Sequence, residues 1–325
     1  MKKWMILFFL LCLLAGCASP PVEQPAAAEA VTFPQTTLEA ATVSLTDAPV
    51  PETSEPPPTG VVLEPDAPGI RETRCDVAVV DHSHTEDGYI MVRYFGETDS
   101  RLKVLLKGPS KTYKYDLPRD QWAVLPLSDG DGSYQAGVYR NTAGTKYALV
   151  MSAYFDAEMT DPFAPFLRPN QFVNYLDAPN TVALGAEVCF GLEGTLDKVA
   201  AVYDHVVENL SYDEEKAATV QSGYLPSPDA VLAAGKGICF DYAAVMTSML
   251  RSQNVPCKLV VGYAGSVYHA WISVWVEEIG WIHGAIYFDG HNWKRMDPTF
   301  ASSAQTQEQI LDLIENGSYT EMYFY

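Results

Sequence analysis

Cys239 stands at a position where a cysteine can act as a nucleophile. It follows the Gly-rich stretch Gly235-Lys236-Gly237 and opens an apolar segment that is predicted to be helical to about Ser252. The free amides and the partial positive charge of a helix N-terminus favour a thiolate over a thiol. Cys239 is therefore a candidate nucleophile, whereas a lone cysteine without partners is more often a small buried hydrophobe.

Two downstream segments contain a base and a group that can orient it. His269 lies 30 residues after Cys239 in the strand-like run 268–276, which can pair with 258–263, and Asp297 follows 28 residues later. A single histidine, or an aspartate before proline, is ordinary by itself. Together, a cysteine at a helix start and a histidine and an aspartate on two adjacent strands have the geometry that thiolate catalysis requires.

These motifs, in this order, resemble the transglutaminase-like superfamily of cysteine acyl-transferases and peptidases. The matching residues span about 195–302 and are Gly237 to Ala243, Leu250-Arg251, Val255-Pro256, Val261 to Tyr263, His269-Ala270-Trp271, and Trp293 with Asp297-Pro298-Thr299. The resemblance implies a papain-like α+β core, with helices packed on an antiparallel sheet. It also implies that Cys239 is the nucleophile, His269 the base and Asp297 its orienting group.

An oxyanion hole would use the Cys239 backbone amide and an upstream donor, for which Tyr212 is the candidate. The calcium sites of animal transglutaminases are not recognisable, so no cofactor is expected. Asp241 and Arg251 are interpreted as structural, because the helix dipole alone explains a carboxylate in the first helical turn. Asp81-His82-Ser83-His84 places two imidazoles on one face of a strand, but no third metal ligand is evident. A solvated loop is therefore expected there, and no metal site.

Short β-rich runs separated by turn residues extend from about Ile70 to Asp156. Candidate strands are Val77–Val80, Tyr89–Phe95, Leu102–Lys107, Lys111–Asp116, Tyr134–Arg140 and Tyr147–Asp156. This spacing predicts an antiparallel, immunoglobulin-like β-sandwich over residues 69–160, although the Cys…Trp…Cys pattern of a true immunoglobulin domain is missing. Nothing in this region indicates catalysis, so we expect a spacer or a binding module.

The transglutaminase-like domain is assigned to residues 161–325. Its predicted elements are an irregular connector marked by Pro162, Pro165, Pro169 and Pro179, a helix with Thr195 as N-cap, and a short helix from Ser227-Pro228 to Gly235. A further helix is predicted at about 305–316. The aromatic tail Tyr319–Tyr325 is expected to pack back on the core.

The N-terminal residues predict export and lipid anchoring. Lys2 and Lys3 precede an apolar run, Trp4–Leu14, that is too short to span a membrane and ends in Leu14-Ala15-Gly16-Cys17. This pattern resembles bacterial lipoproteins, which implies a signal peptide over 1–16 and acylation of Cys17; a plain signal peptide is the alternative. Residues 17–68 then form a predicted disordered tether, because Ala18–Pro68 holds 11 of the 22 prolines and no Lys or Arg.

Charge and cysteine usage limit the partners. The net charge of −20 becomes −22 when Lys2 and Lys3 leave with the signal, so nucleic acid is not expected as a partner. Lipid on Cys17 is instead expected to hold the chain at the membrane. If Cys239 stays free, at most one disulfide is expected among Cys75, Cys189 and Cys257.

The sequence therefore predicts a lipid-anchored protein on the extracytoplasmic side of a bacterial membrane. Its expected activity is thiol-dependent amide chemistry on cell-surface proteins or cell-wall peptides, as a peptidase, a deamidase or a transglutaminase-type acyl transferase. The alternative is a catalytically weak binding or scaffold lipoprotein, because a fold alone does not establish an activity.

Overall fold

The computed structural model describes residues 59–264, 267–277, 280–283, 286–288, 293–295 and 319–325. All of these residues belong to one compact unit. The predicted signal peptide, Cys17, most of the tether, Asp297 and the predicted helix at 305–316 lie outside the described residues. In the part of the chain that is described, no helix is both long enough and apolar enough to cross a membrane.

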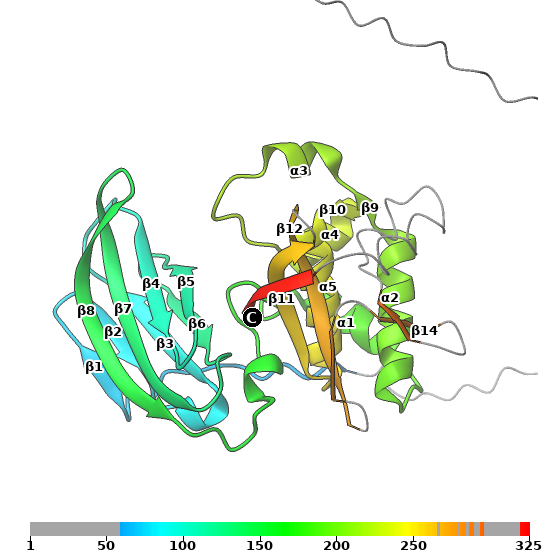
Figure 1. Cartoon of the computed structure of the whole chain (residues 1–325), viewed down its shortest axis with the longest axis horizontal. Coiled ribbons are helices and arrows are strands. Elements are labelled where there is room, and N and C mark those ends of the chain that lie inside the picture. The colour runs from blue at the N-terminus through cyan, green and yellow to red at the C-terminus, as the bar shows by residue number, and fades with distance from the viewer. Residues whose placement is uncertain (1–58, 265–266, 278–279, 284–285, 289–292, 296–318) are drawn as a thin grey trace, which may run out of the picture. The chain divides into compact units, whose positions relative to one another are not determined.

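Residues 72–157 form two four-stranded antiparallel sheets (Figure 1). The first has the order β1-β2-β3-β6, with β1 (Glu72–Arg74), β2 (Ala78–Asp81), β3 (Tyr89–Tyr94) and β6 (Trp122–Pro126). The second has the order β5-β4-β7-β8, with β5 (Thr112–Asp116), β4 (Leu102–Lys107), β7 (Gly132–Ala143) and β8 (Lys146–Ala157). Alternate residues of both sheets join one apolar core, among them Val80, Ile90, Val104 and Ala153.

The six strands predicted in this region are confirmed, with small shifts at their ends. Two further strands were not predicted. β1 is a short polar edge strand with no apolar alternation, and β6 lies between turn residues and ends in a proline. The two-sheet arrangement is observed, whereas the immunoglobulin-like type stays a prediction.

A single buried helix organises the second region. α5 (Cys239–Ser252) contacts β11 (Cys257–Ala264) and β12 (Val267–Val276), and every one of its residues from Asp241 onward is buried. These strands belong to the antiparallel sheet β13-β12-β11-β16, completed by β13 (Gly280–His283) and β16 (Tyr319–Phe324). The region is thus mixed α/β, and the aromatic tail does return to the core, as a strand paired with β11.

Further helices and short strands accompany α5 in this region. The helices α1 (Pro179–Val188), α2 (Thr195–Asn209) and α4 (Pro228–Ala234) pack on α5. α3 (Glu214–Thr219) follows β9 (Ser211–Tyr212), which pairs in parallel with β10 (Lys236–Gly237). β14 (Ile286–Phe288) pairs with β15 (Trp293–Arg295).

Two predictions for this region were wrong in detail. Pro179 does not mark an irregular connector; it occupies the first turn of α1, where a proline is tolerated because that N–H has no helical partner. Thr195 is the first residue of α2 and Gly194 is its N-cap. The predicted short helix from Ser227-Pro228 is confirmed as α4, and Gly235 ends it in the left-handed conformation with φ 63°.

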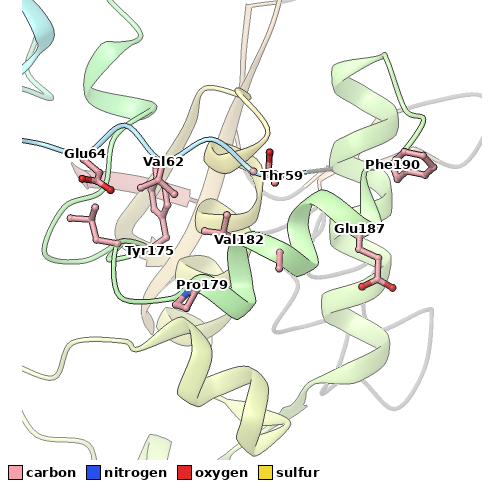
Figure 2. Close-up of a pocket in the computed structure, with 11 residues that line it drawn as sticks. Thr59, Val62, Glu64, Tyr175, Pro179, Val182, Glu187 and Phe190 are labelled. Atoms are coloured by element: carbon pink, nitrogen blue, oxygen red, sulfur yellow. The ribbon is translucent and has the colours of Figure 1, made fainter. Parts of the chain in front are cut away.

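The last ten residues of the predicted tether are packed rather than free. The Val61 amide donates to the Ser252 carbonyl at 2.8 Å, and a Cβ at Gly60 would lie 2.6 Å from Val182 Cγ1. Figure 2 shows Val62, Tyr175 and Val182 around a cavity of about 600 Å³ beside this segment. Residues 59–68 therefore belong to the folded part of the chain.

Candidate functional site

Cys239 lies where the sequence predicts it, as the first residue of α5. Its thiol is free and half-buried. The preceding turn is tight, because a Cβ at Gly237 would lie 2.6 Å from Asp241 Cβ, so this position requires glycine. Ile238 is the N-cap in an extended conformation, and α5 then runs from the cysteine into the core.

Asp241 fixes this turn. Its fully buried carboxylate accepts hydrogen bonds from the Ile238 amide at 2.8 Å, from Lys216 Nζ at 2.6 Å and from the Tyr224 hydroxyl at 2.5 Å. We call these four residues the Asp241 cluster. The pKa of Tyr224 is raised by burial first, and then by its hydrogen bond to Asp241 and by the negative charge of that carboxylate. The Tyr224 hydroxyl therefore stays protonated and donates. The sequence predicted a structural role for Asp241 but not the partners on α3 and in the loop after it.

Asp213 forms a second set of contacts between α3 and the turn before Cys239. Its side chain accepts from the Lys216 amide at 3.0 Å and lies 3.0 Å from Lys236 Nζ, while its amide donates to the Gly237 carbonyl at 2.9 Å. α3 has no buried residues of its own, so these polar contacts position it. Residues 213–224 are thereby held against the turn that presents Cys239.

His269 lies on β12, opposite Gly262 of β11, and is only 6% exposed. Its ring centroid is 6.3 Å from that of Trp271. A Cβ at Gly262 would collide with the Thr320 carbonyl, so glycine allows β16 to approach here. Since α5 contacts β12, the structure brings the elements that carry Cys239 and His269 together. The catalytic pairing of the two side chains stays a prediction.

Tyr268 is the residue before His269 on β12. Its pKa is raised by burial first, then by Tyr323, Tyr263 and Cys239. Tyr263 and Tyr268 are opposite each other on β11 and β12, with ring centroids 5.5 Å apart, and they are 40% and 59% exposed. The sequence did not indicate this exposed tyrosine pair, because Tyr263 stands in a family motif and Tyr268 in a separate strand-like run.

The remaining predicted site residues have different outcomes. Tyr212 pairs with Gly237, two residues before Cys239, which brings it to the same turn; its oxyanion role stays a prediction. Asp297 and Cys17 lie outside the described residues. The strand that leads towards Asp297, β15, pairs with β14, whereas β12 pairs with β11 and β13 among the described strands.

The two histidines at 82 and 84 lie in the loop after β2. His82 stacks on Phe155 with centroids 5.3 Å apart, and His84 lies between Asp66 and Asp87 at 2.9 Å and 2.8 Å. Across the described residues, no group of three or more His, Cys, Asp or Glu side chains is arranged to hold a metal ion.

Comparisons with known proteins match the second region. Residues 183–298 match the family model of the transglutaminase-like superfamily. The uncharacterized protein YebA of Bacillus subtilis is 28% identical over 109 residues, which are 28% of this chain and 15% of that protein. The protein-glutamine gamma-glutamyltransferase of Pseudomonas aeruginosa is 28% identical over 90 residues, 23% of this chain and 12% of that protein. The chain thus spans only a small part of these relatives.

Two solved structures are more distant. A candidate cysteine protease from Cytophaga hutchinsonii is 16% identical with a TM-score of 0.37, covering 73% of this chain and 76% of that one. Red sea bream transglutaminase is 13% identical with a TM-score of 0.27, covering 67% and 48%. The assignment therefore rests on the family model and on the ordered motifs around Cys239 and His269. Residues 183–298 of this chain form a match to the transglutaminase-like superfamily.

Proposed function

We propose that this protein catalyses thiol-dependent chemistry at an amide bond. His269 takes the proton of Cys239, the thiolate attacks the amide carbonyl, and the imidazolium returns the proton to the departing amine as the C–N bond breaks. The resulting thioester is then resolved by water or by a second amine. Asp297 orients His269, and Tyr212 assists the oxyanion. The observation that carries the proposal is the half-buried thiol at the start of the otherwise buried helix α5.

The other described thiols support this choice of nucleophile. Burial raises the pKa of Cys257 to about 11 and also raises the pKa of Cys189, so both are protonated and enclosed at neutral pH. Cys75 is half-buried like Cys239, but it lies between β1 and β2, away from any helix start. Cys239 alone among these four combines access with the free amides of a helix N-terminus.

The proposal also includes the location of the protein, the role of its two-sheet region and the class of its substrate. The lipobox-like sequence at Cys17 supports a lipid-anchored protein outside a bacterial membrane, with cell-surface proteins or cell-wall peptides as substrates. The strand orders β1-β2-β3-β6 and β5-β4-β7-β8 support an immunoglobulin-like sandwich that holds the enzyme domain away from the lipid. The name of the Pseudomonas aeruginosa relative favours glutamine side chains as acyl donors.

Alkylation by iodoacetamide at neutral pH tests the nucleophile. We expect Cys239 to react faster in the native protein than in denatured protein, and we expect the fast phase to vanish in Cys239→Ala but remain in the matched control Cys75→Ala. Incubation with cell-envelope peptides then tests the activity by mass spectrometry. Peptides cleaved, deamidated or joined by the wild type but not by Cys239→Ala support the proposal; a native rate no faster than the denatured rate refutes it.

A further inference from the structure

Lys258, on β11 and outside the Asp241 cluster, places its ammonium among aromatic side chains. Its ammonium lies 3.7 Å from the ring centroid of Trp281, 4.8 Å from that of Phe166 and 5.1 Å from that of Phe324. The ammonium of Lys258 has no hydrogen bond or ion pair with any described residue. Burial lowers its pKa to about 8, opposed by Glu321 and reinforced by Lys111. The amine is therefore enclosed by aromatic rings without a direct anionic partner.

This amine lines a cavity of about 300 Å³. The cavity is formed by the turns after β4 and β6, the connector around Phe166, and the strands β11 and β16. Its polar lining includes Ser110, Lys111, Ser128, Asp129 and Lys258, and its apolar lining includes Leu127, Met159, Pro162, Pro165, Phe166 and Phe324. None of these residues belongs to α5, so the cavity is separate from the machinery proposed for amide chemistry.

Hydrogen-bond donors are in excess in this cavity. Asp129 is already satisfied, because it accepts from the Ser110 amide at 2.5 Å, from Ser110 Oγ at 2.6 Å and from the Lys111 amide at 2.8 Å. Lys111 Nζ donates to the Met322 carbonyl at 2.8 Å. Ser128 is only 9% exposed, and its hydroxyl has no partner. A buried hydroxyl and an enclosed ammonium without acceptors are both costly, and an anion would satisfy both.

We propose that this cavity binds a small organic carboxylate, with Lys258 and Ser128 as donors to its oxygens. Lys111, Lys258 and Asp129 give the lining itself a single positive charge, which a monocarboxylate neutralises and a dianionic phosphate exceeds, while Glu321 lies outside the lining. The apolar lining favours a ligand with a hydrocarbon body, and the volume is at the lower end of the range for small-molecule sites.

Butyrate is a suitable probe, with butyramide as its neutral isostere and inorganic sulfate as a plain anion. By calorimetry we expect saturable butyrate binding to the wild type, weakened roughly tenfold in Lys258→Met and by a smaller factor in Ser128→Ala. Lys107→Met, which removes an exposed lysine at the end of β4, is the matched control and is expected to bind normally. Butyramide and sulfate are expected not to compete.

A second measurement keeps the proposal testable if Lys258→Met does not fold. In the unmodified protein, the ε-carbon chemical shift of Lys258 reports its protonation, and bound butyrate is expected to raise the pKa of Lys258 above its value of about 8 because it binds the charged form. Butyrate affinity is accordingly expected to fall as the pH rises through 8 to 10. An unmoved Lys258 pKa, equal binding by Lys258→Met, or equal competition by butyramide or sulfate overturns the proposal.

Discussion

The two ends of α5 each bury a charge, but they satisfy it in different ways. Near the N-terminal end, the carboxylate of Asp241 is bound mainly by side chains, those of Lys216 and Tyr224, with one backbone amide. Near the C-terminal end, the guanidinium of Arg251 is bound only by main-chain carbonyls, those of Cys257 at 2.9 Å, Arg168 at 2.5 Å and Tyr325 at 2.6 Å. Among the described residues, Arg251 has no acidic partner.

This difference indicates that Arg251 stabilises the fold, whereas Asp241 positions the turn before Cys239. Carbonyls cannot change rotamer, so Arg251 locks together three segments of chain that are far apart in sequence. Burial lowers its pKa to about 10, which still leaves it charged at neutral pH. The partners of Asp241 are side chains, which can change rotamer, and the side chain of Lys216 is 28% exposed. A change at Lys216 can therefore alter the hydrogen bonds of Asp241. We therefore expect changes at Arg251 to affect stability and changes near Asp241 to affect Cys239 reactivity.

The largest effect is expected for Arg251→Met. It removes the charged donor from three main-chain carbonyls, of which that of Tyr325 keeps the Leu259 amide, at a cost of about 4 kcal/mol in the free energy of unfolding. Urea denaturation measures this. Arg251→Lys keeps the charge but not the fork of donors and should lose about half as much. A loss below about 1 kcal/mol in Arg251→Met would show that the carbonyls find other partners.

Asp241→Asn should be less costly and should act on the site. It keeps the shape but leaves Lys216 without a counter-charge, so we expect a loss of roughly 2 kcal/mol in urea denaturation. We also expect slower alkylation of Cys239, because the asparagine offers one acceptor oxygen to the three donors that hold the turn before it. Arg251→Lys is the control for general destabilisation. If both variants slow alkylation equally, the two ends of α5 do not have separate roles.

Tyr224→Phe removes one hydrogen bond to Asp241 and should cost about 1 kcal/mol at neutral pH. The pKa of Tyr224 is raised in the folded state, so its stabilisation is complete below pH 10, where the unfolded tyrosine is also protonated. Above pH 10 the unfolded state ionises first, and this contribution is lost. The stability difference between wild type and Tyr224→Phe is therefore expected to narrow between pH 10 and 11; a constant difference would contradict the assignment.

Tyr268→Ala is expected to change stability least, by under about 0.5 kcal/mol, because the side chain is 59% exposed. Its effect should appear in the KM for a peptide that the wild type turns over, since Tyr268 precedes His269 on β12 and its exposed ring lies against that of Tyr263. Tyr154→Ala, at a tyrosine on β8 that is 71% exposed, is the matched control. An unchanged KM in Tyr268→Ala would remove the tyrosine pair from the site.

Regular alternation made the sandwich strands predictable. In β4, Leu102, Val104 and Leu106 are buried at every second position, and the predicted bounds agree with the observed ones. The same logic failed for β1, whose three residues Glu72-Thr73-Arg74 have no apolar face, and for α1, where Pro179 was taken as a sign of irregular chain. Helix and strand periods identify elements that bury one face, and they miss short or polar elements held by their neighbours.

For the site, the sequence predicted the place of Cys239 at the start of α5 and of His269 on a strand that pairs with β11. It did not predict what holds the turn. Lys216 and Tyr224 lie 25 and 17 residues from Asp241, in a segment without apolar periodicity. The carbonyl partners of Arg251 could not be predicted from the sequence, because every residue has a main-chain carbonyl. The residue types of Arg168 and Tyr325 therefore do not indicate this contact.

The bond between the Val61 amide and the Ser252 carbonyl has a mechanical consequence. Val61 precedes the two β-sheets in the chain, and Ser252 is the last residue of α5. The bond therefore fastens the segment that leads into the sheets to the end of α5 opposite the one that presents Cys239.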